Sequence, residues 1–145
     1  MVSGDLEATD ILLRRAQDTF PNYVLARTTL AQLRVAQKRY PEAITFFKGC
    51  AEASPSAHSL YQLAVALELA GHINEAQNVF RNFELGAEAQ SSSKDNANLE
   101  LIFYYADRAH QTLKALHLAQ HEIACRHDVY TLDAYAWALH INRQK

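Results

Sequence analysis

The sequence predicts an all-α protein built from repeated helix pairs. Its clearest sign is self-similarity at a shift of 33 residues: Leu30-Ala31 returns as Leu63-Ala64, and Ala43 returns as Ala76. A repeat of this period is typical of stacked supersecondary units. Composition agrees, because the 145 residues contain only four Gly and three Pro, too few for the many turns of an all-β chain. Apolar residues also recur at helical spacing along most of the chain.

The first three expected helices cover residues 5–19, 24–39 and 41–53. The first has an apolar stripe, with Asp5 as its predicted N-cap and Pro21 just after its end. Pro41 opens the third helix at a position where its missing N–H costs nothing.

The next pair is expected at residues 57–70 and 73–85. Gly71 provides the tight turn between these two helices, because glycine is suited to a left-handed position after a helix. The period then slips, since Ala76 corresponds to Ala115 at a shift of 39. The polar segment 91–95 accommodates the extra residues and is predicted to be a loop.

Helices at 96–109, 112–125 and 130–141 complete the chain, for an expected total of about seven helices. We expect one repeat domain over residues 1–145. Its expected parts are an unpaired second helix, three helix pairs and an unpaired first helix, at residues 5–21, 24–55, 57–86, 96–127 and 130–145 respectively.

These residues resemble the tetratricopeptide repeat (TPR), a helix–turn–helix unit of 34 residues. In that family a bulky–small pair in the first helix packs against a small residue and an aromatic in the second, as Leu30-Ala31 would pack against Ala43 and Phe47. The resemblance implies a right-handed superhelical solenoid. Arg34 departs from the pattern, because it stands where the family often has an aromatic residue.

The resemblance also implies a concave groove lined by the first helices, which the family uses to bind peptides or partner helices. Register with the Leu-Ala pairs places the following residues in that groove: Thr28, Gln32, Val35, Tyr61, Gln62, Val65, Glu68, Glu100, Leu101, Tyr104, Asp107, Arg108, Asp133, Trp137 and His140. The aromatics would anchor a partner, with core aromatics between repeats as the alternative. The groove has more carboxylates than basic groups and favours a partner with basic and apolar residues.

Other chemistry is poorly supported by the sequence. His117, His121 and Cys125 share one helix face and form a weak candidate metal site, with a solvated polar face as the alternative. The chain has no nucleophile elbow and no phosphate-binding glycine loop, so we expect neither an enzyme nor a cofactor. Arg27, Arg34, Lys38 and Arg39 are read as a solvated helix face and not as a nucleic-acid site.

Two function classes remain open. The favoured one is a protein-binding adaptor or scaffold. The alternative is a self-assembly element, because the chain opens and closes on expected half-repeats, and the last helix is apolar nearly all round. We expect no membrane span, and no signal peptide is visible. Cytoplasmic is therefore the default location, although a mature exported chain would look the same.

Overall fold

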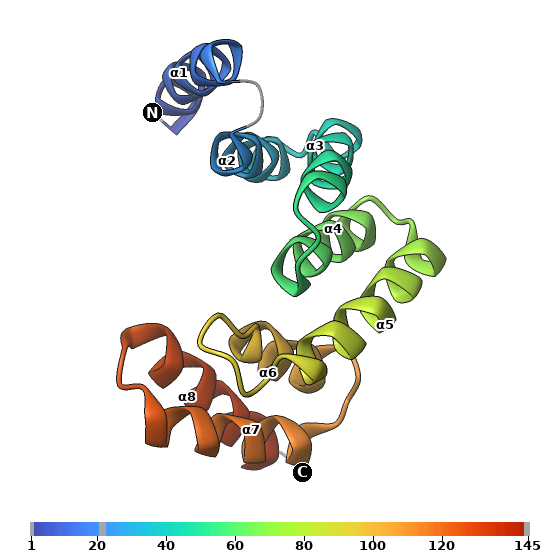
Figure 1. Ribbon diagram of the computed structural model, residues 1–145, viewed down its shortest axis with the longest axis vertical. Coiled ribbons are helices and arrows are strands. Elements are labelled where there is room, and N and C mark those ends of the chain that lie inside the picture. Colours follow the sequence, from blue (N-terminus) through green and yellow to red (C-terminus); the bar gives the residue numbers. More distant parts are fainter. Residues whose placement is uncertain (1, 21–22, 144–145) are drawn as a thin grey trace. The chain divides into compact units, whose positions relative to one another are not determined.

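The computed structural model describes residues 2–20 and 23–143, with the backbone alone for Val2 and Ser3. All regular structure in these residues is α-helical, and there are eight helices (Figure 1). In chain order they are α1 (Val2–Thr19), α2 (Val24–Ala36), α3 (Tyr40–Ala53), α4 (Ala57–Leu69), α5 (Ile73–Ala89), α6 (Asn98–Asp107), α7 (Thr112–Cys125) and α8 (Val129–Arg143). The prediction of an all-α protein is confirmed, whereas the expected total of about seven helices is wrong.

Several helix boundaries differ from the expected ones. Asp5 is not an N-cap, because α1 already begins at Val2 and Asp5 lies in its first turn. The helix α5 continues through Gly86 to Ala89, since glycine is tolerated within a helix when tertiary packing supports it. Pro21, predicted to mark the end of the first helix, lies outside the described residues.

Residues related by the repeat are buried in the structure. Both Leu-Ala pairs are nearly inaccessible, with exposures of 0% for Leu30 and Ala31 and of 6% and 0% for Leu63 and Ala64. Buried second-helix residues at the predicted positions are Ala43, Phe47 and Cys50 in α3, Ala76, Phe80 and Phe83 in α5, and Ala115 and Ala119 in α7. The apolar pattern of the sequence therefore corresponds to the core.

The turns that follow α2, α4 and α6 share a left-handed residue. Gly71 has a φ of 84°, as predicted, and Lys38 and His110 have φ values of 59° and 53°. These three residues are spaced by 33 and 39, the same shifts that relate Ala43, Ala76 and Ala115. After α4, the Gly71 N–H donates to the Glu68 carbonyl at 3.0 Å and the His72 N–H to the Leu67 carbonyl at 2.9 Å, which is a Schellman cap.

These turns lead to a stability prediction. A left-handed conformation costs a non-glycine residue ~1–2 kcal/mol, and replacement by glycine removes that cost. Glycine also makes the unfolded chain more flexible, which reduces the gain in stability by ~0.4–1 kcal/mol. We therefore expect Lys38→Gly and His110→Gly to raise the free energy of unfolding modestly and Gly71→Ala to lower it. Urea unfolding followed by far-UV circular dichroism measures all three. Stabilisation by Gly71→Ala would contradict the left-handed role of this residue.

The chain divides into two compact units, residues 1–83 and 84–145, with the division falling within α5. In the first unit α2 packs against α1 and α3, and α3 packs against α4. Tyr61 of α4 contacts two aromatic rings of α5, with centroid distances of 6.0 Å to Phe80 and 5.1 Å to Phe83.

In the second unit α6, α7 and α8 all pack against one another. The loop before α6 is anchored by a buried pair, in which Asn98 Nδ2 donates to Glu122 Oε1 at 2.7 Å and to the Ser91 carbonyl at 2.9 Å. Tyr105 and Lys114 both bind Glu88, which connects the end of α5 to α6 and α7. Burial and the neighbouring Glu88 carboxylate raise the pKa of Tyr105. No helix in the described part of the chain has the length and apolar character needed to cross a membrane.

Candidate functional site

The predicted groove residues of the first unit are mostly engaged in packing. Thr28 Oγ1 donates to Cys50 Sγ at 3.6 Å, so this side chain faces α3. Tyr61 packs on the α5 aromatics, in keeping with the alternative of a core aromatic. Gln32 is exposed, whereas the other predicted residues of this unit are half-buried: Val35, Gln62, Val65 and Glu68.

In the second unit, two of the predicted groove residues belong to the core. Leu101 and Tyr104 are only 2% and 8% exposed. The Tyr104 hydroxyl donates to Glu84 Oε2 at 3.2 Å, and its ring is tilted against that of Tyr105 at 5.6 Å. The exposed predicted residues of this unit lie instead one turn further along α6 and on α8.

Four of the predicted residues form one surface in the second unit, which we call the Trp137 surface: Asp107, Asp133, Trp137 and His140. Trp137, the only tryptophan of the chain, is 40% exposed. Its indole Nε1 donates to Asp107 Oδ1 at 2.7 Å, which joins α8 to α6. Its ring stacks on His140 with centroids 5.6 Å apart and an interplanar angle of 26°. A large aromatic side chain is thus exposed and held in place.

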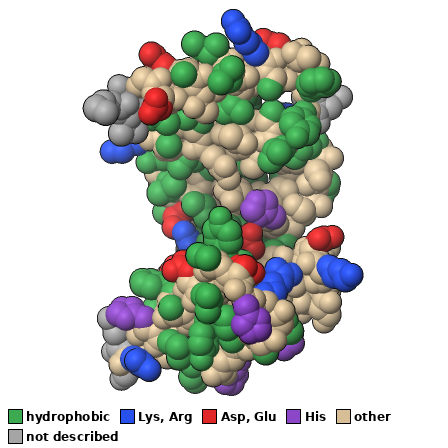
Figure 2. Space-filling model, turned by 90° about the vertical axis from the view of Figure 1, so that its left-hand side faces the viewer, with side chains coloured by type: hydrophobic (Ala, Val, Ile, Leu, Met, Phe, Trp, Pro, Cys, Tyr) green, Lys and Arg blue, Asp and Glu red, His purple; other side chains and the backbone are tan. Residues whose placement is uncertain are grey.

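The Trp137 surface combines apolar and acidic character, because Asp107 of α6 and Asp133 of α8 are both exposed. Glu100 and Arg108, the remaining predicted residues of this unit, are half-buried. Hydrophobic side chains reach the surface among charged ones elsewhere too, as Figure 2 shows for one face of the molecule. The Trp137 surface is distinguished by an aromatic ring that two contacts hold in position.

The candidate metal residues do not form a metal site. His117, His121 and Cys125 are all exposed on α7. Within the described residues, no three His, Cys, Asp or Glu side chains are arranged so that they could hold a metal ion. His121 instead lies beside Glu122, with His121 Nδ1 and Glu122 Oε1 3.7 Å apart.

Arg34 is a buried residue, so the prediction that it lies on a solvated helix face is wrong. Its side chain is 1% exposed. Its Nη2 donates to Asp10 Oδ1 of α1 at 2.7 Å, its Nη1 donates to Gln37 Oε1 at 2.7 Å, and its Nε pairs with Glu42 Oε2 of α3 at 3.2 Å. One guanidinium group therefore connects α1, α2 and α3.

The repeat register contains the signal that predicts this burial. A shift of 33 places Arg34 at the position of Leu67, which is 0% exposed, and places Asp10 at the position of Ala43, which is also 0% exposed. An ion pair thus occupies two positions that are apolar in the next repeat. Burial would raise the pKa of Asp10, but hydrogen bonds from Arg34 and Arg14, together with their charges, outweigh it and keep this pKa below its ordinary value.

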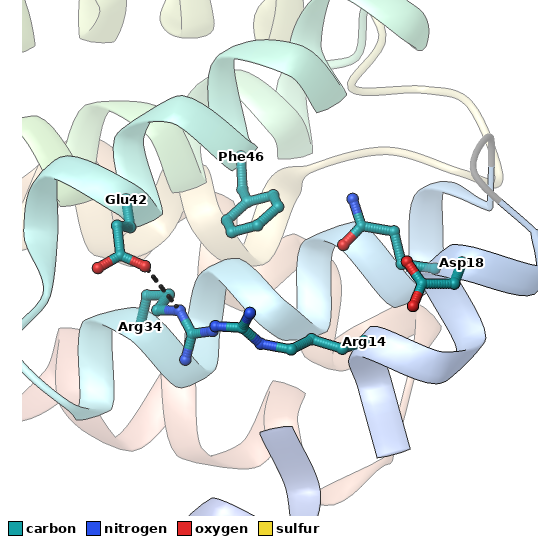
Figure 3. Close-up of a pocket in the computed structure, with 6 residues that line it drawn as sticks. Arg14, Asp18, Arg34, Glu42 and Phe46 are labelled. Atoms are coloured by element: carbon teal, nitrogen blue, oxygen red, sulfur yellow. Dashed lines mark ion pairs between the residues drawn. The ribbon is translucent and has the colours of Figure 1, made fainter. Parts of the chain in front are cut away.

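A cavity of about 590 Å³ lies next to Arg34 between α1, α2 and α3 (Figure 3). Arg14 and Arg34 reach toward each other in it, and the Phe46 ring forms a wall. Its charged lining consists of two arginines and two acids, the latter being Asp18 and Glu42. The formal charges of this lining therefore balance.

No protein-family model, no curated protein and no solved structure matches this chain.

Proposed function

We propose that this chain is a TPR-like helical-repeat protein that binds a protein or peptide partner, and that the Trp137 surface is part of its binding site. The observation that carries the proposal is the exposed, immobilised indole of Trp137, bound to Asp107 and stacked on His140. Aromatic side chains of this kind dominate binding energy at protein interfaces. Fixing the ring before binding reduces the entropy lost when a partner docks.

The TPR-like character of the proposal is supported by the geometry of the repeat. Left-handed turn residues follow α2, α4 and α6 at the spacing of the repeat, and the Leu-Ala pairs and second-helix alanines are buried in register. The proposal includes no catalytic step and no cofactor. An aromatic ring with flanking carboxylates is suited to recognition of a segment that carries basic and apolar side chains.

Self-association is a second candidate, favoured by the exposed apolar side chains at the start of α8. Val129 and Tyr130 are each 76% exposed and Leu132 is 50% exposed, so a second copy of the chain could cover apolar area there. Light scattering across a range of protein concentrations measures this directly. An increase in mass with concentration that Leu132→Asp abolishes would support self-association.

Substitution of Trp137 tests the binding proposal. Random nonapeptides displayed on phage are selected on the intact chain, and Kd is measured by fluorescence anisotropy of labelled peptides. Because truncating a hot spot costs at least ~2 kcal/mol, we expect Trp137→Ala to weaken binding by about 30-fold or more.

The matched control is Leu113→Ala, which removes a 66%-exposed apolar side chain of α7 outside the Trp137 surface. It should leave Kd unchanged, and circular dichroism should show that both variants remain folded. Selected peptides that bind Trp137→Ala as tightly as the unaltered chain would refute the proposed site.

A further inference from the structure

The side chains of the Trp137 surface follow one another along a single face of α8. Asp133, Trp137 and His140 are spaced by four and three residues, which places them one above the other on a helix. Helical side chains lean toward the N-terminus of their helix. His140 therefore leans over Trp137, and Trp137 leans toward the turn that carries Asp133.

The indole of Trp137 is 40% exposed, and the helix places a carboxylate one turn away from it. The ring contacts His140 on one face, and its N–H is already donated to Asp107. Asp133 is exposed and makes no hydrogen bond or ion pair with any described residue. The exposed part of the ring and the Asp133 carboxylate can thus act on the same group of a partner.

The chemistry of these two groups favours a cation, and a planar cation in particular. A positive charge over the face of tryptophan is attracted by the ring quadrupole, more strongly than over the other aromatic side chains. A guanidinium group can in addition stack flat on the ring and form two parallel hydrogen bonds to one carboxylate, whereas an ammonium group acts as a point charge. Arginine uses both features of the site at once.

We infer that the Trp137 surface binds an arginine side chain of the partner, with the guanidinium stacked on the exposed part of the indole ring and paired with Asp133. This inference rests on the proposed function and specifies the residue that the site recognises. Asp107 assists by holding the indole in the orientation that receives the guanidinium, and its charge adds to the attraction.

The experiment begins with peptides selected on the intact chain whose binding depends on Trp137. The inference requires that they are enriched in arginine at one position. Replacing that arginine by citrulline, a neutral group of the same shape, should weaken binding to the unaltered chain by about tenfold or more. Replacing it by lysine should weaken binding by a smaller factor. Binding should also quench the fluorescence of Trp137, the only tryptophan.

A double-mutant cycle tests whether Asp133 is the carboxylate that pairs with the arginine of the peptide. With Asp133→Asn, citrulline in place of arginine should change Kd by no more than about threefold, because the charge pair has already been removed. Asp95→Asn is the matched control, since Asp95 is an exposed acid of the loop before α6, and it should preserve the full effect of citrulline.

Three results would overturn the inference: no arginine enrichment, an equal effect of citrulline on the unaltered chain and on Asp133→Asn, or unchanged binding when lysine replaces the arginine. A selection that yields no Trp137-dependent peptide refutes the proposed function itself. The two failures are therefore distinguishable.

Discussion

Replacement of Arg34 by alanine is expected to destabilise the first unit by about 3 kcal/mol, the lower end of the ~3–5 kcal/mol that breaking a buried ion pair costs. The substitution removes the contact that connects α1, α2 and α3 and leaves Asp10 and Glu42 without their shared partner. The loss stays at the lower end because Asp10 retains Arg14 at 3.2 Å. Urea unfolding monitored by circular dichroism measures the change.

Arg39→Ala is the matched control for Arg34→Ala. Arg39 pairs with the same Glu42, with Nη2 and Oε1 2.6 Å apart, but its side chain is 46% exposed. Exposed ion pairs contribute roughly 0–1 kcal/mol, so the control should unfold nearly as the unaltered chain does. Equal effects of the two substitutions would show that Arg34 has no special role in holding the three helices.

The double substitution Asp10→Ala, Arg34→Leu sharpens this test, because it restores the residue types found one repeat later at Ala43 and Leu67. Replacing a buried ion pair by well-packed apolar residues is often neutral or stabilising. We therefore expect the double variant to regain most of the stability that Arg34→Ala loses. A double variant as unstable as the single one would contradict the equivalence of the two repeats.

The second large effect is expected for Phe47→Ala, which should lower the free energy of unfolding by ~3–5 kcal/mol, as truncation of a buried aromatic residue does. Phe47 is 2% exposed and occupies the repeat position of Phe80, which is 4% exposed. Removal of its ring leaves a cavity that the surrounding helices fill only in part. The same unfolding measurement applies.

The adjacent Phe46 provides the control for Phe47→Ala. Its ring is half-buried at the wall of the Arg34 cavity, so truncation loses less contact area. We expect Phe46→Ala to cost about 1–1.5 kcal/mol, in proportion to the smaller area that the ring buries. If Phe46→Ala cost as much as Phe47→Ala, the core would not lie where the repeat places it.

The helices and core positions could be predicted from the sequence because they depend on local periodicity. Leu30, Leu63 and the second-helix alanines are buried as their spacing predicts. Gly71 could be assigned to a left-handed turn because glycine is the residue that most readily adopts it. The residue types of Lys38 and His110 disfavour this conformation, so only their register with Gly71 indicates it.

The candidate site was only partly predictable, because the face of a helix that a residue occupies depends on small changes of register. The sequence places Trp137 and Asp107 at the surface, where they lie, but it assigns Leu101 and Tyr104 to the same face, and these are buried. The contact between Trp137 and Asp107 joins two helices across 30 residues of sequence, and no local pattern reveals it. The charge of Arg34 suggests a solvated position, whereas its register with Leu67 indicates the burial that the structure has.

The ion pair between Asp10 and Arg34 makes the repeats of this chain non-interchangeable. A helix with alanine at the position of Asp10, as α3 has at Ala43, would leave the Arg34 guanidinium without one of its carboxylate partners if it took the place of α1 against α2. The apolar positions around Leu67 would in turn bury the unpaired Asp10 carboxylate if α1 took the place of α3 against α4. Each interface therefore disfavours the helix of the other interface. The ion pair between Asp10 and Arg34 thus helps to determine which helices pack together in the first unit.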